Sequence, residues 1–84
     1  MRPITLEPLA RRQVRALPAG EADEVAGALM KLASAADPYT LLDPYTPGGL
    51  GPVPYHGVLV TGRTEAVVTL YSDHVRVVAV RPRR

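Results

Sequence analysis

Cysteine, tryptophan and phenylalanine are all missing from this chain of 84 residues, and Lys31 is its single lysine. The absence of cysteine excludes disulfides, thiolate catalysis and cysteine-ligated zinc. No apolar run approaches the roughly 20 residues needed to cross a bilayer, and the start, MRPITLEPL, lacks the hydrophobic stretch of a signal peptide. We therefore expect residues 1–84 to form a single cytoplasmic domain with no metal and no cofactor.

Basic charge comes almost entirely from arginine. The net charge is only +2, and hydrophobic residues make up 46% of the chain, as in a globular protein. Arginines cluster at residues 11–15 and, as Arg81, Arg83 and Arg84, at the end of the sequence. Because guanidinium groups bind phosphate and carboxylate in a bidentate manner, an anionic partner is one interpretation. A solvated surface with a basic tail is the other.

Apolar residues recur at helical spacing in two segments separated by Pro18. The first covers residues 6–17, with Thr5 as a candidate cap and Pro8 in the first turn. The second covers residues 20–35, and carboxylates in its first turn complement the helix dipole. The predicted buried stripes are Leu6, Ala10, Val14 and Leu17 in the first helix and Val25, Leu29, Leu32 and Ala36 in the second. The short break between them predicts an antiparallel helical hairpin.

Residues 37–54 are rich in proline and glycine, which predicts a loop. The tetrapeptide DPYT occurs twice, at residues 37–40 and 43–46, and Asp-Pro starts turns readily, so two successive turns are expected. Tyr39 and Tyr45 either stack on nucleic-acid bases or cover the edge of a core, which is the commoner role of loop tyrosines.

After the loop the hydrophobic period changes to two. YHGVLVT, EAVVTLY and VRVVAVR, residues 55–61, 65–71 and 75–81, are predicted to be strands. A two-residue turn at residues 62–63 fits type II′, with Gly62 supplying the positive φ. A short strand at residues 2–5 fits a sheet edge, because Pro3 cannot donate to a ladder. The elements predict an α+β fold in the order strand, helix, helix, three strands. Its helical hairpin packs on one face of a small, mainly antiparallel, curved sheet.

Pairing the strands about residues 62–63 divides the sheet into two faces. A second turn of Ser72-Asp73 or of Asp73-His74 leaves that division unchanged. The face predicted to receive the helices carries Tyr55, Gly57, Leu59, Ala66, Val68, Leu70, Val75, Val77 and Ala79. The face predicted to stay open carries His56, Val58, Val60, Glu65, Val67, Thr69, Tyr71, Arg76, Val78 and Val80.

Acid–base chemistry has one candidate location, the middle of the open face. His56, Tyr71 and Arg76 converge there beside Thr69, and we predict them as the catalytic set, with His56 as general base. The predicted contacts to RNA phosphates are Arg81, Arg83 and Arg84. Ser72, Asp73 and His74 are adjacent in a turn and are not expected to form a relay.

The element order and two stretches of sequence resemble the RelE/ParE toxins of bacterial type II toxin–antitoxin modules. The stretches are ITLEPLARRQVRALPAGEADEVAGALMKLASAADP and YHGVLVTGRTEAVVTLYSDHVRVVAVRPRR, which together cover nearly the whole chain. The resemblance implies a RelE-like fold and an antitoxin protein as partner. It also implies one of two activities, because many members cleave messenger RNA in the ribosomal A site, whereas those of the ParE type inhibit DNA gyrase.

The chain departs from the cleaving members where they carry cations. Aligned on Gly62, two strand arginines of the family fall on Val58 and Val60, and the arginine after the turn falls on Glu65. The family's terminal His-Arg-Arg is similar to residues 82–84, but the tyrosine often found after it is missing. Stabilising a pentavalent phosphate requires cations and proton donors, so the resemblance implies a degenerate active site.

Two functional hypotheses remain open. The first is a RelE-like toxin that inhibits translation as a ribosome-dependent endoribonuclease. The second is a non-catalytic protein of the same fold, either a gyrase inhibitor or a degenerate toxin, that binds through valines on the open face. That apolar face is also a candidate homodimer surface, made of Val58, Val60, Val67 and Val78.

Overall fold

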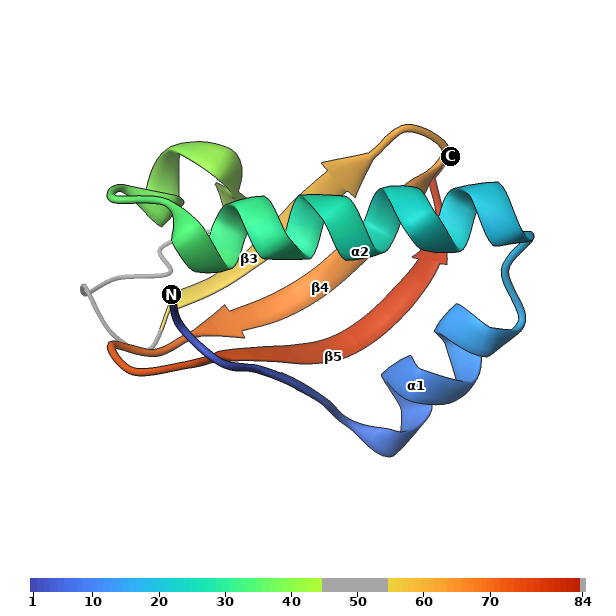
Figure 1. The fold of residues 1–84 in the computed structure, drawn as a ribbon, viewed down its shortest axis with the longest axis horizontal. Coiled ribbons are helices and arrows are strands. Elements are labelled where there is room, and N and C mark those ends of the chain that lie inside the picture. Colours follow the sequence, from blue (N-terminus) through green and yellow to red (C-terminus); the bar gives the residue numbers. More distant parts are fainter. Residues whose placement is uncertain (45–54, 84) are drawn as a thin grey trace.

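The structure, a computed structural model, describes residues 1–44 and 55–83 (Figure 1). In chain order the elements are β1 (Ile4–Leu6), α1 (Pro8–Arg15), α2 (Ala19–Ser34), the 3₁₀ turn η1 (Pro38–Leu41), β2 (Asp43–Pro44), β3 (Tyr55–Thr61), β4 (Thr64–Leu70) and β5 (Val75–Pro82). The sheet order is β1-β5-β4-β3-β2, with β1 parallel to β5 and the other pairs antiparallel. The α+β fold expected from the sequence is confirmed, with β2 as an addition.

Both helices contribute to a core on one side of the sheet. Figure 1 shows α2 crossing in front of β3 and β4, while α1 lies beside β5. Leu32 of α2 is buried together with Val68 and Val77 of the sheet, and Ala10 of α1 joins the same core. The predicted helix-covered side is therefore correct, although the two helices lie over different strands.

α1 begins later than the sequence pattern predicts. Leu6 belongs to β1, where it pairs with Val77, and the N–H of Glu7 donates to the carbonyl of Val77 at 3.0 Å. Glu7 is the N-cap residue and makes no side-chain capping bond, so Thr5 is not the cap. Pro8 opens the helix, a position where its missing N–H removes no hydrogen bond. The expected start at Leu6 is wrong because pairing with β5 outweighs helical periodicity.

α2 has nearly the predicted bounds. Val25, Leu29 and Leu32 form its buried stripe, as expected, whereas Ala36 lies beyond the helix and is exposed. The end of α2 is tied to the N-terminal segment, because the N–H of Arg2 donates to the carbonyl of Ala33.

The first hairpin has the predicted register, and the second begins in one of the two predicted registers. Gly62 has a φ of 63° and is the only residue with positive φ among the described residues. This fits a type II′ turn at residues 62–63. In the second hairpin Leu70 pairs with Val75, and the N–H of Tyr71 donates to the carbonyl of His74 at 2.9 Å. The second turn is therefore Ser72-Asp73, the first of the two alternatives.

One assumption about the sheet was wrong, namely that β5 pairs regularly along its length. The register shifts between Val67 and Val68, so that Val77 pairs with Val68 but Ala79 pairs with Val67. Val78 is thus an extra, bulged residue. Beyond it the facing reverses relative to the prediction: Ala79 opposes Val67 on the open face, and Val80 turns into the core with 2% of its surface exposed.

The DPYT region supports the edge of the core. Its first copy forms η1, and Tyr39 packs edge-on against Tyr55 with ring centres 5.2 Å apart, so the core-covering role of Tyr39 is correct. In the second copy Asp43 and Pro44 form β2 in place of the expected turn, and the remainder, with Tyr45, lies outside the described residues. A Cβ on Gly57 would stand 2.9 Å from Leu42 Cβ, so glycine lets this segment approach β3.

Replacing Val68 by aspartate tests which face carries the core. Val68 is fully buried, and an unpaired carboxylate there should lower the free energy of unfolding by about 3 kcal/mol or more. Val60→Asp is the matched control, because Val60 is 38% exposed on the other face and should change stability by less than about 1 kcal/mol. Denaturant unfolding measures both. Equal losses in the two variants would contradict this assignment of faces.

Candidate active site on the open sheet face

Polar side chains gather at one end of the face that the helices leave open. His56 on β3 pairs across the sheet with Thr69 on β4, and Thr69 pairs with Arg76 on β5. His56 Nδ1 lies 3.1 Å from Thr69 Oγ1. The three side chains therefore form a row across adjacent strands, as predicted from the register. Thr69 is almost fully buried beneath its neighbours, so its hydroxyl serves to hold the imidazole of His56.

Tyr71 extends the row toward the β4–β5 turn. The Arg76 guanidinium carbon lies 5.7 Å from the centre of the Tyr71 ring, within the range of a cation–π contact. His74 stacks on the same Tyr71 ring, with the ring centres 4.3 Å apart and an interplanar angle of 10°. We refer to His56, Thr69, Tyr71, His74 and Arg76 as the open-face cluster.

His74 is also bonded to its neighbour in the turn. Its Nδ1 lies 2.7 Å from Asp73 Oδ1. The hydrogen bond from His74 holds the pKa of the Asp73 carboxyl below its ordinary value, since it stabilises the ionised form. Asp73 is itself exposed, whereas the imidazole is half-buried by its stack on Tyr71.

Arg76 has a carboxylate near it from outside the sheet. Its guanidinium lies 3.8 Å from Glu7 Oε1, at the junction of β1 and α1, and both side chains are more than a third exposed. An exposed ion pair of this length contributes little stability. Arg76 is thus oriented on the open face and remains accessible to an anion.

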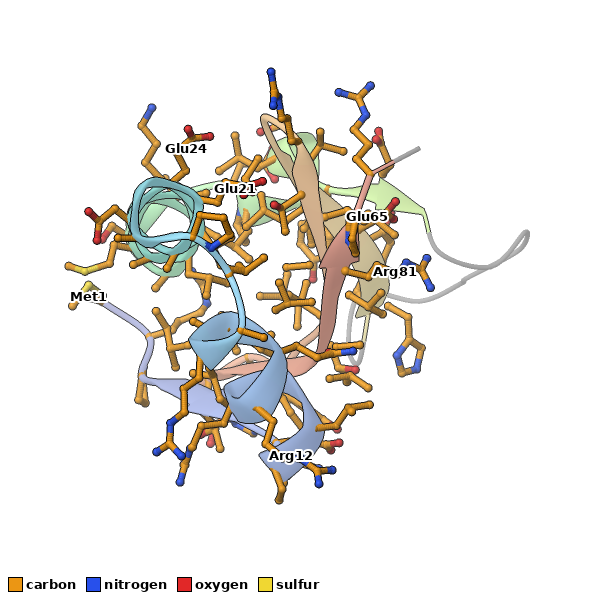
Figure 2. The ribbon with its side chains drawn as sticks, turned by 90° about the vertical axis from the view of Figure 1, so that its right-hand side faces the viewer. Met1, Arg12, Glu21, Glu24, Glu65 and Arg81 are labelled. Carbon is orange, nitrogen blue, oxygen red and sulfur yellow. The ribbon has the colours of Figure 1, made fainter. Side chains whose placement is uncertain are left out.

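The predicted RNA-binding arginines lie at the opposite end of the same face. Arg81 pairs across the sheet with Glu65, and its guanidinium lies 3.3 Å from Glu65 Oε2. Figure 2 shows both side chains on the side of the sheet away from α2. The backbone N–H of Arg83 donates to the carbonyl of Arg63, which places Arg83 beside the first hairpin turn. Arg84 lies outside the described residues.

Valines occupy the middle of the open face. Val58 and Val78 are half-buried, Val67 is buried between its neighbours, and only Val60 is exposed by more than a third. The valine surface is therefore less exposed than the sequence pattern predicts. The central strand is covered because branched side chains on β3 and β5 lean over it.

His74 is the member of the cluster that the sequence prediction missed. Ser72, Asp73 and His74 were not expected to form a relay, and among the described residues no bond joins Ser72 to His74. The bond between Asp73 and His74 was not foreseen. A signal was nevertheless present, because a Ser72-Asp73 turn places His74 directly opposite Tyr71.

Comparison with known proteins identifies the fold. No model of a known protein family matches the chain, and neither does any curated protein. Among solved structures, a chain in the crystal structure of the toxin–antitoxin complex RelBE2 from Mycobacterium tuberculosis matches with a TM-score of 0.62 and 16% sequence identity. The match covers 98% of each chain. The RelE-type fold is therefore confirmed. Within the described residues no helix is long and apolar enough to span a membrane.

The Asp73–His74 bond predicts an acidic titration. Asp73 should titrate below the ordinary value of 3.8, and in His74→Phe its pKa should return toward that value. Because the folded-state pKa is lowered, the stabilisation is present above pH 3.8 and is lost as the pH falls through the folded-state value. Carboxyl chemical shifts followed by NMR over pH 2–6 measure this. A midpoint that His74→Phe leaves unchanged would contradict the bond.

Proposed function

We propose that this chain is the toxin of a two-component toxin–antitoxin module, and that it inhibits translation in the cytoplasm by cleaving messenger RNA on the ribosome. The observation that carries the proposal is the open-face cluster. It brings a cation and several proton-transfer groups together on a RelE-type fold, at the one face that the helices leave uncovered. The fold by itself does not identify the reaction, so the proposal rests on the residues of the open-face cluster.

The proposed reaction cleaves the RNA backbone by transfer of the phosphoryl group from O5′ to the adjacent 2′-oxygen. A ribose 2′-hydroxyl loses its proton and bonds to the adjacent phosphorus, and the bond from phosphorus to O5′ breaks as O5′ gains a proton. Arg76 stabilises the charge that develops on the phosphate oxygens. His56 and Tyr71 are the proton-transfer groups of the predicted set, and His56 is held toward the row by Thr69.

Arg81 and Arg83 lie at the far end of the face and are suited to the neighbouring phosphates of the RNA. Glu65 opposes this role, because its carboxylate lies beside Arg81 and repels a phosphate. The arrangement therefore favours binding that is weak and sensitive to salt. On the ribosome, additional contacts would supply the remaining affinity.

The antitoxin partner is supported by an apolar groove on the other side of the molecule. The groove has a volume of about 270 Å³ and lies between β1, α1 and α2, with Ile4, Leu6, Val14, Ala22, Val25 and Met30 in its lining. Arg11 and Arg15 are four residues apart on α1, so they lie on one side of the helix near Val14, and both are exposed. The surface suits an amphipathic helix that carries apolar side chains along one face and acidic residues beside them.

A non-catalytic binding protein is the second candidate, and the valines favour it. Val58 and Val60 occupy the places where the cleaving members of the resembled family carry arginine. In this alternative the chain acts as a gyrase inhibitor or a degenerate toxin. It would use Val58, Val60, Val67 and Val78 to bind a partner or a second copy of itself.

Removing the charge of Glu65 should strengthen RNA binding. We expect Glu65→Gln to increase the affinity for a short single-stranded RNA about fivefold, near 1 kcal/mol, and to steepen its salt dependence. Asp23→Asn is the matched control, because it makes the same change of net charge on α2. Fluorescence anisotropy at two salt concentrations measures the affinities. An equal increase in both variants would show a general charge effect and no role for this end of the face.

Cleavage of messenger RNA on programmed ribosomes tests the proposed activity. The intact chain should cleave, and Arg76→Ala should reduce the rate by roughly 10²-fold or more because it removes the cation at the phosphate. His56→Ala should reduce the rate as well, by an amount that reports its share of proton transfer. Lys31→Ala, on the outer surface of α2, serves as a control that should retain full activity.

Two outcomes would contradict the proposal. Undiminished cleavage by both Arg76→Ala and His56→Ala would place the active site elsewhere. An intact chain that arrests growth without cleaving messenger RNA would favour the non-catalytic alternative, and a dimer disrupted by Val60→Asp would then identify the valine surface as its interface.

A further inference from the structure

The two histidines of the open-face cluster differ in how their ring nitrogens are fixed. His56 Nδ1 faces the hydroxyl of Thr69, which can either donate or accept a hydrogen bond. His74 Nδ1 faces the carboxylate of Asp73, which accepts only when ionised. Asp73 is ionised at neutral pH, because an aspartate carboxyl titrates well below neutrality and this bond lowers its pKa further. Nδ1 of His74 must therefore donate, and the neutral imidazole keeps an unprotonated Nε2.

Two contacts fix the position of the His74 ring. Its ring stacks on Tyr71 on one side, and its Nδ1 is anchored 2.7 Å from Asp73 Oδ1. A carboxylate that orients an imidazole in this way also makes it a better proton acceptor. The guanidinium of Arg76 contacts the same Tyr71 ring, so His74 and Arg76 share this neighbour in the open-face cluster.

We propose that His74, oriented by Asp73, is the general base that removes the 2′-hydroxyl proton in the cleavage reaction; this rests on the proposed function. His74 Nε2 takes the proton as the 2′-oxygen bonds to phosphorus. The bond from phosphorus to O5′ breaks, and O5′ leaves with the proton of the Tyr71 hydroxyl. The proton on His74 then returns to Tyr71 through solvent, so both groups end in their starting states. In this assignment His74 takes the role of base that the sequence prediction gave to His56, so His56→Ala should lower the rate less than His74→Phe.

Charged and titratable groups near His74 come from the β4–β5 turn, from β5 and from the start of α1. Asp73 and Tyr71 lie in or next to the turn, Arg76 lies two residues after His74 on β5, and Glu7 lies beside Arg76. The carboxylate favours the protonated imidazole and the guanidinium disfavours it. The bond to Asp73 is therefore the contact whose removal tests how the His74 ring is held.

His74→Phe is the informative variant, because it keeps an aromatic ring for the stack on Tyr71 and removes both nitrogens. On programmed ribosomes we expect kcat to fall about 10²-fold or more with KM nearly unchanged. Asp73→Asn should lower kcat less, because the imidazole remains but is no longer held by a carboxylate. Asp23→Asn, on the helix side, should retain the activity of the intact chain.

A second measurement does not depend on cleavage. ¹⁵N chemical shifts of the free protein should show neutral His74 protonated at Nδ1 and unprotonated at Nε2, and Asp73→Asn should weaken that preference. The opposite tautomer, or a His74→Phe variant with full kcat, would overturn the role of His74 while leaving the nuclease activity standing. Absence of cleavage by the intact, folded chain would overturn the proposed function and this role together.

Discussion

A single extra residue in β5 determines how both faces of the sheet are used. With regular pairing from Leu70 and Val75 onward, Val80 would oppose Glu65 on the open face. Because Val78 is bulged, Val80 turns into the core and Arg81 comes opposite Glu65. On its other edge β5 pairs with β1 only as far as Val77, and α1 lies beside the part that follows. There the N–H of Val80 donates to the side chain of Gln13, 2.7 Å away, and this bond attaches α1 to the sheet.

Features set by neighbouring residues could be predicted from the sequence, and features set by distant contacts could not. The alternation of β3 and β4 and the glycine turn between them fix the register of the first hairpin, and the stripe of α2 fixes its buried side. The start of α1 depends on the pairing of Leu6 with Val77, and the attachment of α1 to β5 depends on Gln13, 67 positions before Val80. Neither contact leaves a signal in the local pattern. The strand at Asp43 is similar, because it exists only through its pairing with Val58.

The candidate site likewise contains some contacts that the sequence predicts and others that it does not. Cross-strand neighbours such as His56 and Thr69 follow from the register, so their contact was predictable. The role of His74 depends on the conformation of a turn, in which Asp73 reaches back to the imidazole while the ring lies flat on Tyr71. Adjacency in sequence suggested only that a serine relay was unlikely to form there. Adjacency in sequence alone does not predict the stack of His74 on Tyr71, because the stack depends on how β5 pairs with β4.

Two arginines on the open face have carboxylates beside them. Glu7 lies 3.8 Å from Arg76 and Glu65 lies 3.3 Å from Arg81, and the side chains of both arginines are close to half exposed. The pair of Arg76 with Glu7 is exposed on both sides and is worth at most about 1 kcal/mol, because solvent screens the charges and holding two long side chains costs entropy. The side chain of Glu65 is only 20% exposed, so solvent screens its pair with Arg81 less. An anion can therefore displace the carboxylate at Arg76 at a smaller cost than the carboxylate at Arg81. The end of the face with Arg76 is also the one where a guanidinium lies among groups that can transfer a proton.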